Sequence, residues 1–441
     1  MCIRDRGALA AGVNLVAGYP GTPSSEILET ISKYRHDGVY IEWSVNEKAA
    51  MEVAAAAAYS GARAMVTMKQ VGLNVAADPL MSLAYVGVKG GMVIVSADDP
   101  GPISSQTEQD TRRFADFCRI PVFDPSSPEE AYKMIGEAFE YSEKYNTPVL
   151  FRPTTRVCHA YASIDNCDSP SPKKYEGFVK DSKKWVIFPR LSFANHIMIE
   201  KRNVEIGKDF STYSANKAEG GNSEKAVVTS GISYAYTKEC LKDYPDVKLI
   251  KIATAYPFPE DFVLSSLEDA KEVLCIEELS PFIEEQILKL AGKHGLQLKV
   301  SGKLDGKVQA GGENSTDKIA AILGEFLGKD FTAEGYDLSD APALPVRPPV
   351  LCAGCPHRAS FYAVKQAMKG RKAYFCGDIG CYTLGNAMPL DMVDTCLCMG
   401  AGITMAQGFN HTDSDGVCFG FVGDSTFFAS GITGVVNAVH N

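Results

Sequence analysis

The sequence lacks the features that mark several classes of protein. It has no excess of positive charge: 44 Lys and Arg stand against 54 Asp and Glu, which argues against a nucleic acid or an anionic membrane as the main partner. It has no apolar run long enough to cross a bilayer, and the alanine run at 54–58 is typical of a helix. Its first residues, MCIRDRGALAAG, lack the apolar segment and cleavage pattern of a secretory leader. We therefore expect a cytoplasmic protein that binds neither nucleic acid nor membrane.

The cysteines do not form the pattern of a disulfide framework. Thirteen is an odd number, and in a long chain without a leader it indicates free thiols, cofactor ligands or core residues. Cys352 and Cys355 form a C-x2-C pair in CAGCPHR, which suits a metal, an iron–sulfur cluster or a dithiol. There is no clean second C-x2-C pair and no C-x2-C-x2-C-x3-C run. Buried thiols are therefore an equal alternative for this pair.

The chain is too long for one ordinary core, and its pattern predicts three successive α/β domains. Short apolar strands alternate with helical segments, which predicts doubly wound, mainly parallel sheets that are covered on both faces. We place the domains at residues 7–160, 161–340 and 347–441, and the proline-rich stretch LSDAPALPVRPPV marks the second boundary. The third domain is still running at Asn441, so we expect it to be incomplete.

Two carboxylates stand where a predicted strand gives way to a helix. Glu47 opens an alanine-rich helix after EWSVN; it either forms a capping box with Ser44 or points from the strand end into a ligand crevice. Asp424 follows the apolar strand in VCFGFVG; it either caps the next helix or binds a hard cation such as magnesium that bridges phosphates. Local sequence alone favours the cap at both positions.

Eight stretches, in order, resemble one family of enzymes. They are GYPGTPSSE, EWSVNEKAAMEVAAAA, MKQVGLNVAADPLMSLAYVGVKGGMVIVSADDPG, SSQTEQD, CAGCPHR, GDIGCYTLG, CMGAG and GDSTFFASGITGVVNAV. Through them the chain is similar along almost its whole length to indolepyruvate-type alpha subunits of the thiamine-diphosphate-dependent 2-oxoacid:ferredoxin oxidoreductases. In that family the first domain binds the pyrimidine, the second is of the transketolase C-terminal type, and the third binds the diphosphate.

The resemblance implies a role for each carboxylate. Glu47 hydrogen-bonds the aminopyrimidine ring and so promotes removal of the thiazolium C2 proton. Gly423 and Asp424 start the thiamine diphosphate signature, so Asp424 binds Mg²⁺ and, through it, the diphosphate; the third glycine of the signature is Ser425 here. That signature normally finishes with an Asn-type ligand on a later strand. The resemblance therefore implies a chain that is truncated at its C-terminal side.

The resemblance also implies roles for the thiols. Cys352, Cys355 and Cys381 resemble three of the four cysteines that hold a 4Fe-4S cluster beside the cofactor in related enzymes. The alternative is that CAGCPHR and GDIGC, with Gly380, shape the cofactor pocket. His357 is either near the substrate or a structural histidine.

The substrate is expected to meet the loops of the first domain. Thr22, in YPGTPSS, matches a position that contacts the substrate carboxylate or carbonyl in pyruvate ferredoxin oxidoreductases. A 2-oxoacid carboxylate also needs a basic partner, for which arginine is well suited. Arg112 or Arg113, after SSQTEQD, is the candidate, and a surface salt bridge is the alternative.

The implied reaction is oxidative decarboxylation of an aryl pyruvate through a thiamine diphosphate ylide. Coenzyme A accepts the acyl group and ferredoxin accepts the electrons, with a beta subunit as partner in a dimer of alpha–beta pairs. We expect this chain alone to be inactive. Two alternatives stay open: a non-oxidative 2-oxoacid decarboxylase, which needs the same Glu and Asp but no cluster, and a catalytically silent fragment that only associates with partner subunits.

Overall fold

The computed structural model describes residues 3–33, 38–102, 104–164, 171–331, 339–413 and 415–441. The chain divides into two compact units, Met1–Gly335 and Tyr336–Asn441. Within the described ranges, no helix combines the length and the apolar character that a membrane crossing requires.

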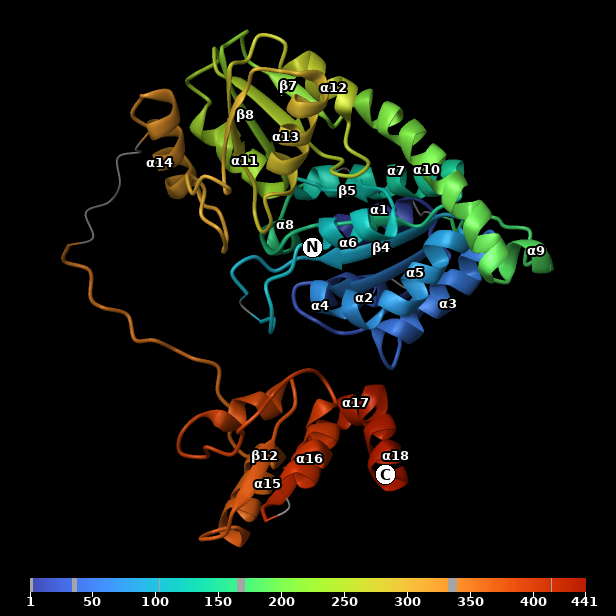
Figure 1. Ribbon diagram of the computed structural model, residues 1–441, viewed down its shortest axis with the longest axis vertical. Coiled ribbons are helices and arrows are strands. Elements are labelled where there is room, and N and C mark those ends of the chain that lie inside the picture. The colour runs from blue at the N-terminus through green and yellow to red at the C-terminus, as the bar shows by residue number, and fades with distance from the viewer. Residues whose placement is uncertain (1–2, 34–37, 103, 165–170, 332–338, 414) are drawn as a thin grey trace. The chain divides into compact units, whose positions relative to one another are not determined.

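The first unit contains a six-stranded sheet whose strand pairings are all parallel (Figure 1). The spatial order reverses beside β1, because β2 lies on one side of it and β3 and β4 follow on the other. In open α/β sheets, ligands bind beyond the carboxyl ends of the strands at such a reversal. In spatial order the strands are β2 (Tyr40–Trp43), β1 (Leu15–Gly18), β3 (Ala64–Lys69), β4 (Met92–Ala97), β6 (Val149–Phe151) and β5 (Val122–Phe123).

Helices cover both faces of this sheet. Successive strand residues point to opposite faces, so that Ile94 of β4 lies in one hydrophobic core and Val95 in the other. Helices α3 to α6 contribute to the core of Ile94, while α1, α2 and α7 contribute to the core of Val95. These helices are α1 (Ile3–Ala10), α2 (Ser25–Lys33), α3 (Glu47–Tyr59), α4 (Gln70–Val75), α5 (Ala77–Val86), α6 (Thr111–Cys118) and α7 (Pro128–Tyr145).

A second, five-stranded sheet lies in the same unit. Strand β7 runs antiparallel to β9, and the other pairings in this sheet are parallel. The order is β11 (Lys299–Ser301), β10 (Glu272–Ile276), β8 (Lys225–Ser230), β9 (Lys248–Ile252) and β7 (Lys217–Glu219). The other helices of this unit are α8 (Thr155–His159), α9 (Ser182–Trp185), α10 (Pro189–Ser211), α11 (Gly231–Cys240), α12 (Glu260–Ser266), α13 (Phe282–His294) and α14 (Thr316–Leu327).

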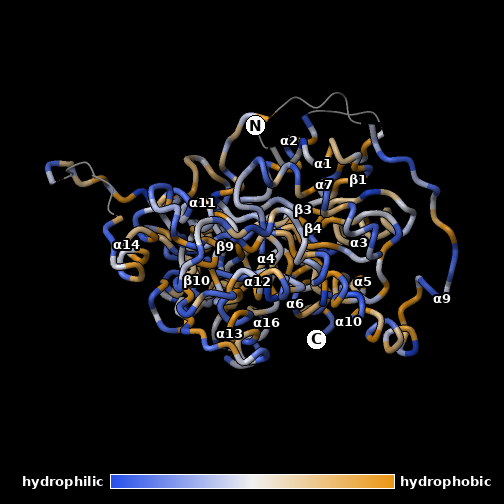
Figure 2. Tube along the Cα trace, turned by 90° about the horizontal axis from the view of Figure 1, so that it is seen from above, coloured by the Kyte–Doolittle hydropathy of each residue, from blue (hydrophilic) through white to orange (hydrophobic). Residues whose placement is uncertain are grey.

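The two sheets share one continuous core. Val66 of β3 and Val228 of β8 belong to the same cluster of buried side chains. The regions that we treat as two successive domains in the sequence are therefore packed into one compact unit. Residues 171–181, which lead into α9, are largely hydrophilic (Figure 2).

The second unit is smaller and has two parallel strands, β12 (Ala373–Cys376) and β13 (Val417–Gly420). Cys376 pairs with Gly420, so the loops that follow the two strands start side by side. The unit also contains α15 (Pro356–Ala367), the 3-10 helix η1 (Cys381–Asn386), α16 (Ala401–Thr412), α17 (Asp424–Thr426), the π-helical turn η2 (Phe427–Gly431) and α18 (Ile432–His440). These parallel, helix-covered sheets confirm the predicted α/β class.

Candidate active site

Glu47 is the first residue of α3 and follows the carboxyl end of β2. The N-cap is Asn46, whose side chain accepts a hydrogen bond from the N–H of Ala49 at 2.8 Å. Ser44 instead donates to the carboxylate of Glu42 at 2.5 Å. The capping-box alternative for Glu47 is therefore wrong, because Asn46 caps the helix and Glu47 stands two positions before the third helical position that a capping box requires.

The carboxyl group of Glu47 is buried against the backbone of Gly72. The residue is 7% exposed, and a Cβ at Gly72 would lie 2.5 Å from its Oε1. Only glycine leaves room for the carboxyl group there. Burial raises the pKa of Glu47, and its own backbone N–H and the charge of Lys69 oppose part of the rise. A dry carboxyl group with a raised pKa at the end of a strand is suited to exchanging a proton with a ligand.

Three loops meet beside this carboxyl group at the carboxyl ends of β1, β3 and β4. Thr22, in the loop after β1, is exposed, and its carbonyl accepts a hydrogen bond from Ser104 Oγ at 3.2 Å. Lys69 at the end of β3 donates from Nζ to the carbonyl of Ser104 at 2.9 Å. The next residue, Gln70, donates from Nε2 to the carbonyl of Thr107 at 3.3 Å. At the β1–β3 reversal, the loops that follow the strands are thus joined to one another by hydrogen bonds.

Arg112, which we predict from sequence to bind the substrate, has a different position. Its guanidinium is fully buried and pairs with the carboxylates of Asp110 and Glu277 at 2.6 and 2.8 Å. It also donates to the carbonyls of Glu278 and Ser280, which follow β10. The prediction that Arg112 contacts the substrate is therefore wrong. Its guanidinium is occupied by bonds that join α6 to the loop after β10 of the second sheet. The surface alternative is also wrong for Arg112, because the pair is buried.

Arg113 takes the role of the surface salt bridge. It pairs with Glu285 at 2.5 Å, and both side chains are partly exposed. The guanidinium carbon of Arg113 also lies 5.2 Å from the centroid of the Phe282 ring. The segment after SSQTEQD therefore contributes to the packing of α6 on α13.

In the second unit, the signature residues Gly423 and Asp424 follow β13. Gly423 is the N-cap of α17 and Asp424 is its first residue, so Asp424 is not the helix cap. Asp424 and Ser425 are both exposed. Mg²⁺ usually takes one or two protein carboxylates and completes its shell with phosphates and water. A single exposed carboxylate beside a glycine turn fits that requirement.

Asp378, which is not among the predicted site residues, holds this glycine turn in place. It is 1% exposed, and its two carboxylate oxygens accept hydrogen bonds from the N–H groups of Gly400, at 2.8 Å, and Gly423, at 3.0 Å. One buried carboxylate thus joins the loops GDIGC, CMGAG and GDS. The sequence holds a signal for it, since a Gly-Asp pair follows each of the two strands β12 and β13.

The thiols predicted to hold a cluster do not converge. Cys352 and Cys381 are exposed and Cys355 is half-buried. In the part of the chain that the structure describes, no three His, Cys, Asp or Glu side chains come together as a metal-binding group. As placed, these residues do not fit a 4Fe-4S cluster.

His357 links the two cysteine-containing segments. Its ring stacks on Tyr382 of η1 with a centroid distance of 4.0 Å. Gly380, just before η1, has a φ of 119°, which favours glycine. Arg358 donates from Nε to the carbonyl of Cys352 at 3.0 Å. These contacts favour the structural interpretation of His357.

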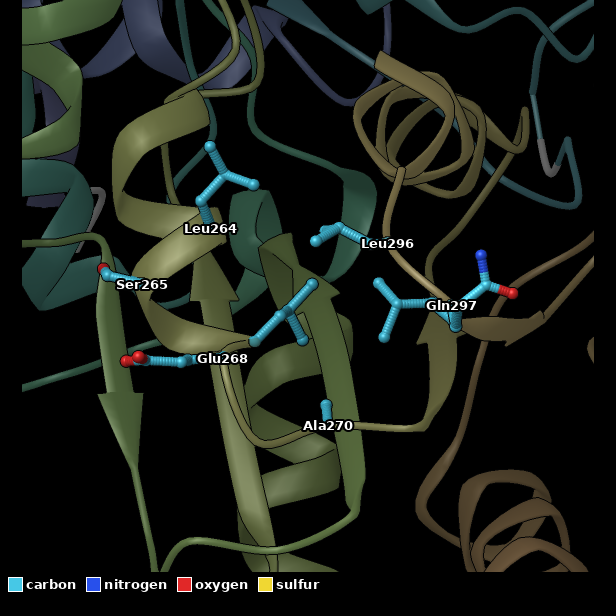
Figure 3. Close-up of a pocket in the computed structure, with 8 residues that line it drawn as sticks. Leu264, Ser265, Glu268, Ala270, Leu296 and Gln297 are labelled. Atoms are coloured by element: carbon cyan, nitrogen blue, oxygen red, sulfur yellow. The ribbon is translucent and has the colours of Figure 1, made fainter. Parts of the chain in front are cut away.

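A pocket elsewhere in the first unit is separate from these residues. Figure 3 shows it between α12 and the turn before β11. Leu264, Glu268, Leu296 and Gln297 are among the residues that line it, and none of the site residues above belongs to the lining. We therefore assign it no part in the site.

Comparison with known proteins gives the family. Residues 6–207 match the family described as "Pyruvate flavodoxin/ferredoxin oxidoreductase, thiamine diP-bdg". The indolepyruvate oxidoreductase subunit IorA of Methanothermobacter marburgensis is 40% identical over 99% of this chain and 71% of its own length. This chain belongs to the IorA family. The resemblance of the eight stretches is thus confirmed, and the chain is a thiamine-diphosphate-type 2-oxoacid oxidoreductase subunit.

Other comparisons agree with this family. IorA of Thermococcus kodakarensis is 39% identical over 99% of this chain and 71% of its own length. The solved 2-oxoglutarate:ferredoxin oxidoreductase of Magnetococcus marinus, with 2-oxoglutarate, coenzyme A and succinyl-CoA bound, shares the fold with a TM-score of 0.54. That match has 16% identity and covers 74% of this chain and 64% of that chain.

Proposed function

We propose that this chain is the thiamine diphosphate subunit of an enzyme that oxidatively decarboxylates aryl pyruvates. The observation that carries the proposal is Glu47, a buried carboxyl group seated on Gly72 at the strand ends of a domain that matches a thiamine-diphosphate-binding family. Indolepyruvate as the substrate type follows from the names of the IorA relatives. Ferredoxin as the acceptor follows from the description of the matched family.

Each unit has a carboxylate that suits one part of thiamine diphosphate. Glu47 would hold the pyrimidine, and Asp424 would hold Mg²⁺ and, with it, the diphosphate. When bound, the cofactor supplies the electron sink that decarboxylation of a 2-oxoacid needs. The task of Glu47 is to hold or accept a proton at its carboxyl group in a site without water, for which its burial and raised pKa are suited.

The backbone around the site keeps these side chains in place. Gly72 leaves the space that the Glu47 carboxyl group fills. Asp378 holds the N–H of Gly423 and so presets the turn on which Asp424 stands. Electron transfer through the thiols of the second unit is not part of this proposal, because the described thiols are not positioned to hold a cluster.

A partner completes the proposed assembly. The relatives are named as subunits of an oxidoreductase, so we propose a beta subunit as partner, in a dimer of alpha–beta pairs. Coenzyme A is the proposed acyl acceptor; it is bound in the Magnetococcus enzyme, which shares the fold.

The test is an anaerobic assay of the co-expressed assembly loaded with thiamine diphosphate and Mg²⁺. We expect ferredoxin reduction that requires both indolepyruvate and coenzyme A, yields acyl-CoA and is lost in Glu47→Gln. Release of carbon dioxide without acceptor reduction would instead identify a non-oxidative decarboxylase. An assembly that binds the cofactor but turns over no 2-oxoacid would identify a catalytically silent subunit.

A further inference from the structure

Lys69 lies where the order of the first sheet reverses. It is the last residue of β3, next to the loop that follows β1. A Cβ at Gly21 would lie 3.0 Å from both Cγ and Cδ of Lys69, so the stem of the lysine lies on the backbone of that loop. Its ammonium reaches Ser104 in the loop after β4, donating to the carbonyl at 2.9 Å. The lysine therefore spans from the loop after β1 to the loop after β4.

The ammonium of Lys69 has more N–H donors than hydrogen-bond partners among the described residues. An ammonium group has three N–H donors, and among the described residues its one hydrogen bond goes to a neutral carbonyl and no ion pair includes it. Burial lowers the pKa of Lys69, while the charges of Asp99 and Glu47 raise it in part. The carboxylate of Asp99 is bonded by Ser105 Oγ at 2.9 Å and Thr155 Oγ1 at 2.8 Å. A half-buried cation of this kind gains most from an incoming anion.

Four other cations of the first unit have partners. Arg112 and Arg152 are fully buried, each between two carboxylates. Arg113 pairs with Glu285, and Lys48 on the outer side of α3 pairs with Glu52. These four are therefore weaker candidates than Lys69 for binding an incoming carboxylate.

We propose that Lys69 binds the carboxylate of the 2-oxoacid substrate, with Thr22 in the adjoining loop after β1. This assignment rests on the proposed function, which supplies the substrate class. It gives Lys69 the role that the sequence suggests for Arg112. It also explains how the subunit discriminates a 2-oxoacid from a neutral ketone of the same shape, because the ketone has no carboxylate to pair with the ammonium of Lys69.

The test compares a carboxylate with its neutral isostere at equilibrium. The full chain, loaded with thiamine diphosphate and Mg²⁺, is titrated calorimetrically with 3-phenylpropanoate and with 3-phenylpropanamide, neither of which has a reacting 2-oxo group. We expect the unsubstituted chain to bind the carboxylate at least about tenfold more tightly, which corresponds to about 1.4 kcal/mol. Lys69→Met should bind both probes equally, while Lys69→Arg should keep the preference.

Controls separate this assignment from folding and from the proposed function. Lys48→Met removes a nearby, outward-facing cation and should bind both probes as the unsubstituted chain does. A Lys69→Met chain that keeps the preference, or an unsubstituted chain without one, overturns the assignment. If Lys69→Met does not fold, the neutral, polar Lys69→Gln gives the same decision. An assembly that prefers the carboxylate but oxidises no 2-oxoacid would contradict the proposed function and leave the Lys69 assignment standing.

Discussion

Replacing Arg112 by alanine tests whether this arginine ties the two sheets of the first unit together. The change leaves the carboxylates of Asp110 and Glu277 buried, each 1% exposed, without their common cation. Breaking a buried ion pair by removing one partner costs about 3–5 kcal/mol. Arg113→Ala is the matched control, because Arg113 also lies over the Phe282 ring but pairs with Glu285 where both side chains are about two-fifths exposed. Loss of such a pair costs below about 1 kcal/mol.

The pH dependence of this effect has a definite sign. Burial raises the pKa of Asp110, but the charge and hydrogen bonds of Arg112 outweigh it and lower the pKa to about 2. A carboxyl group with a depressed pKa stabilises the fold above its unfolded pKa of about 3.9 and loses that contribution as the pH falls toward the folded value. The gap in stability between the unsubstituted chain and Arg112→Ala should therefore be wider near neutral pH than near pH 4.

The assay uses the two tryptophans of the chain, Trp43 and Trp185, which both lie in the first unit. Their fluorescence follows unfolding of this unit alone. A loss of 3–5 kcal/mol lowers Tm by about 4–7 °C in a unit of this size, and Arg113→Ala should lower it by about 2 °C or less. Equal Tm values for Arg112→Ala and Arg113→Ala would refute the reasoning, because the buried and exposed pairs would then contribute alike.

Three further predictions concern single side chains. Gly72→Ala places a methyl group 2.5 Å from Oε1 of Glu47, so we expect weaker thiamine diphosphate binding by calorimetry and a stability loss of about 1–3 kcal/mol; unchanged affinity would contradict the proposed seat of Glu47. Burial raises the pKa of Glu278 to about 7, so the free energy of unfolding should fall as the pH rises through that value. Thermal melts at several pH values should show a smaller fall for Glu278→Gln. An unchanged pH dependence in this variant would exclude Glu278 as the cause of the fall. Asp378→Asn turns one hydrogen-bond acceptor into a donor that faces an N–H group, so Mg²⁺-dependent cofactor binding should weaken about tenfold, or about 1.4 kcal/mol. The Tm detected by tryptophan fluorescence should not change, because both tryptophans lie in the other unit. A lower Tm would instead indicate a general folding defect.

The local pattern of the sequence predicts most of the framework. Strands such as AMVTMK and MVIVSA are short and apolar, and the structure buries them in a parallel sheet. Glu47 could also be placed at a strand end, because a predicted strand precedes it and an alanine-rich helix follows. The choice of N-cap could not be predicted, because Asn46 and Ser44 are both good caps and only the end of β2 decides between them.

Residues that depend on distant partners could not be predicted. Glu277 is 165 positions from Arg112, so no local pattern shows that the arginine is buried between the sheets. Asp378 becomes important only because β12 pairs with β13 and brings the N–H of Gly423 to its carboxylate. Lys69 looks like an ordinary strand end until the loop of Gly21 lies against its stem.

The account depends most directly on whether Glu47 and Asp424 each contribute to the binding of thiamine diphosphate. The measurement is a calorimetric titration of the chain with thiamine diphosphate in the presence of Mg²⁺, for the unsubstituted chain, Glu47→Gln and Asp424→Asn. We predict saturable binding of one cofactor per chain, a loss of Mg²⁺ dependence in Asp424→Asn, and weaker binding in Glu47→Gln at unchanged Mg²⁺ dependence. Binding that neither substitution alters would contradict the account, because the cofactor would then occupy a site that involves neither carboxylate.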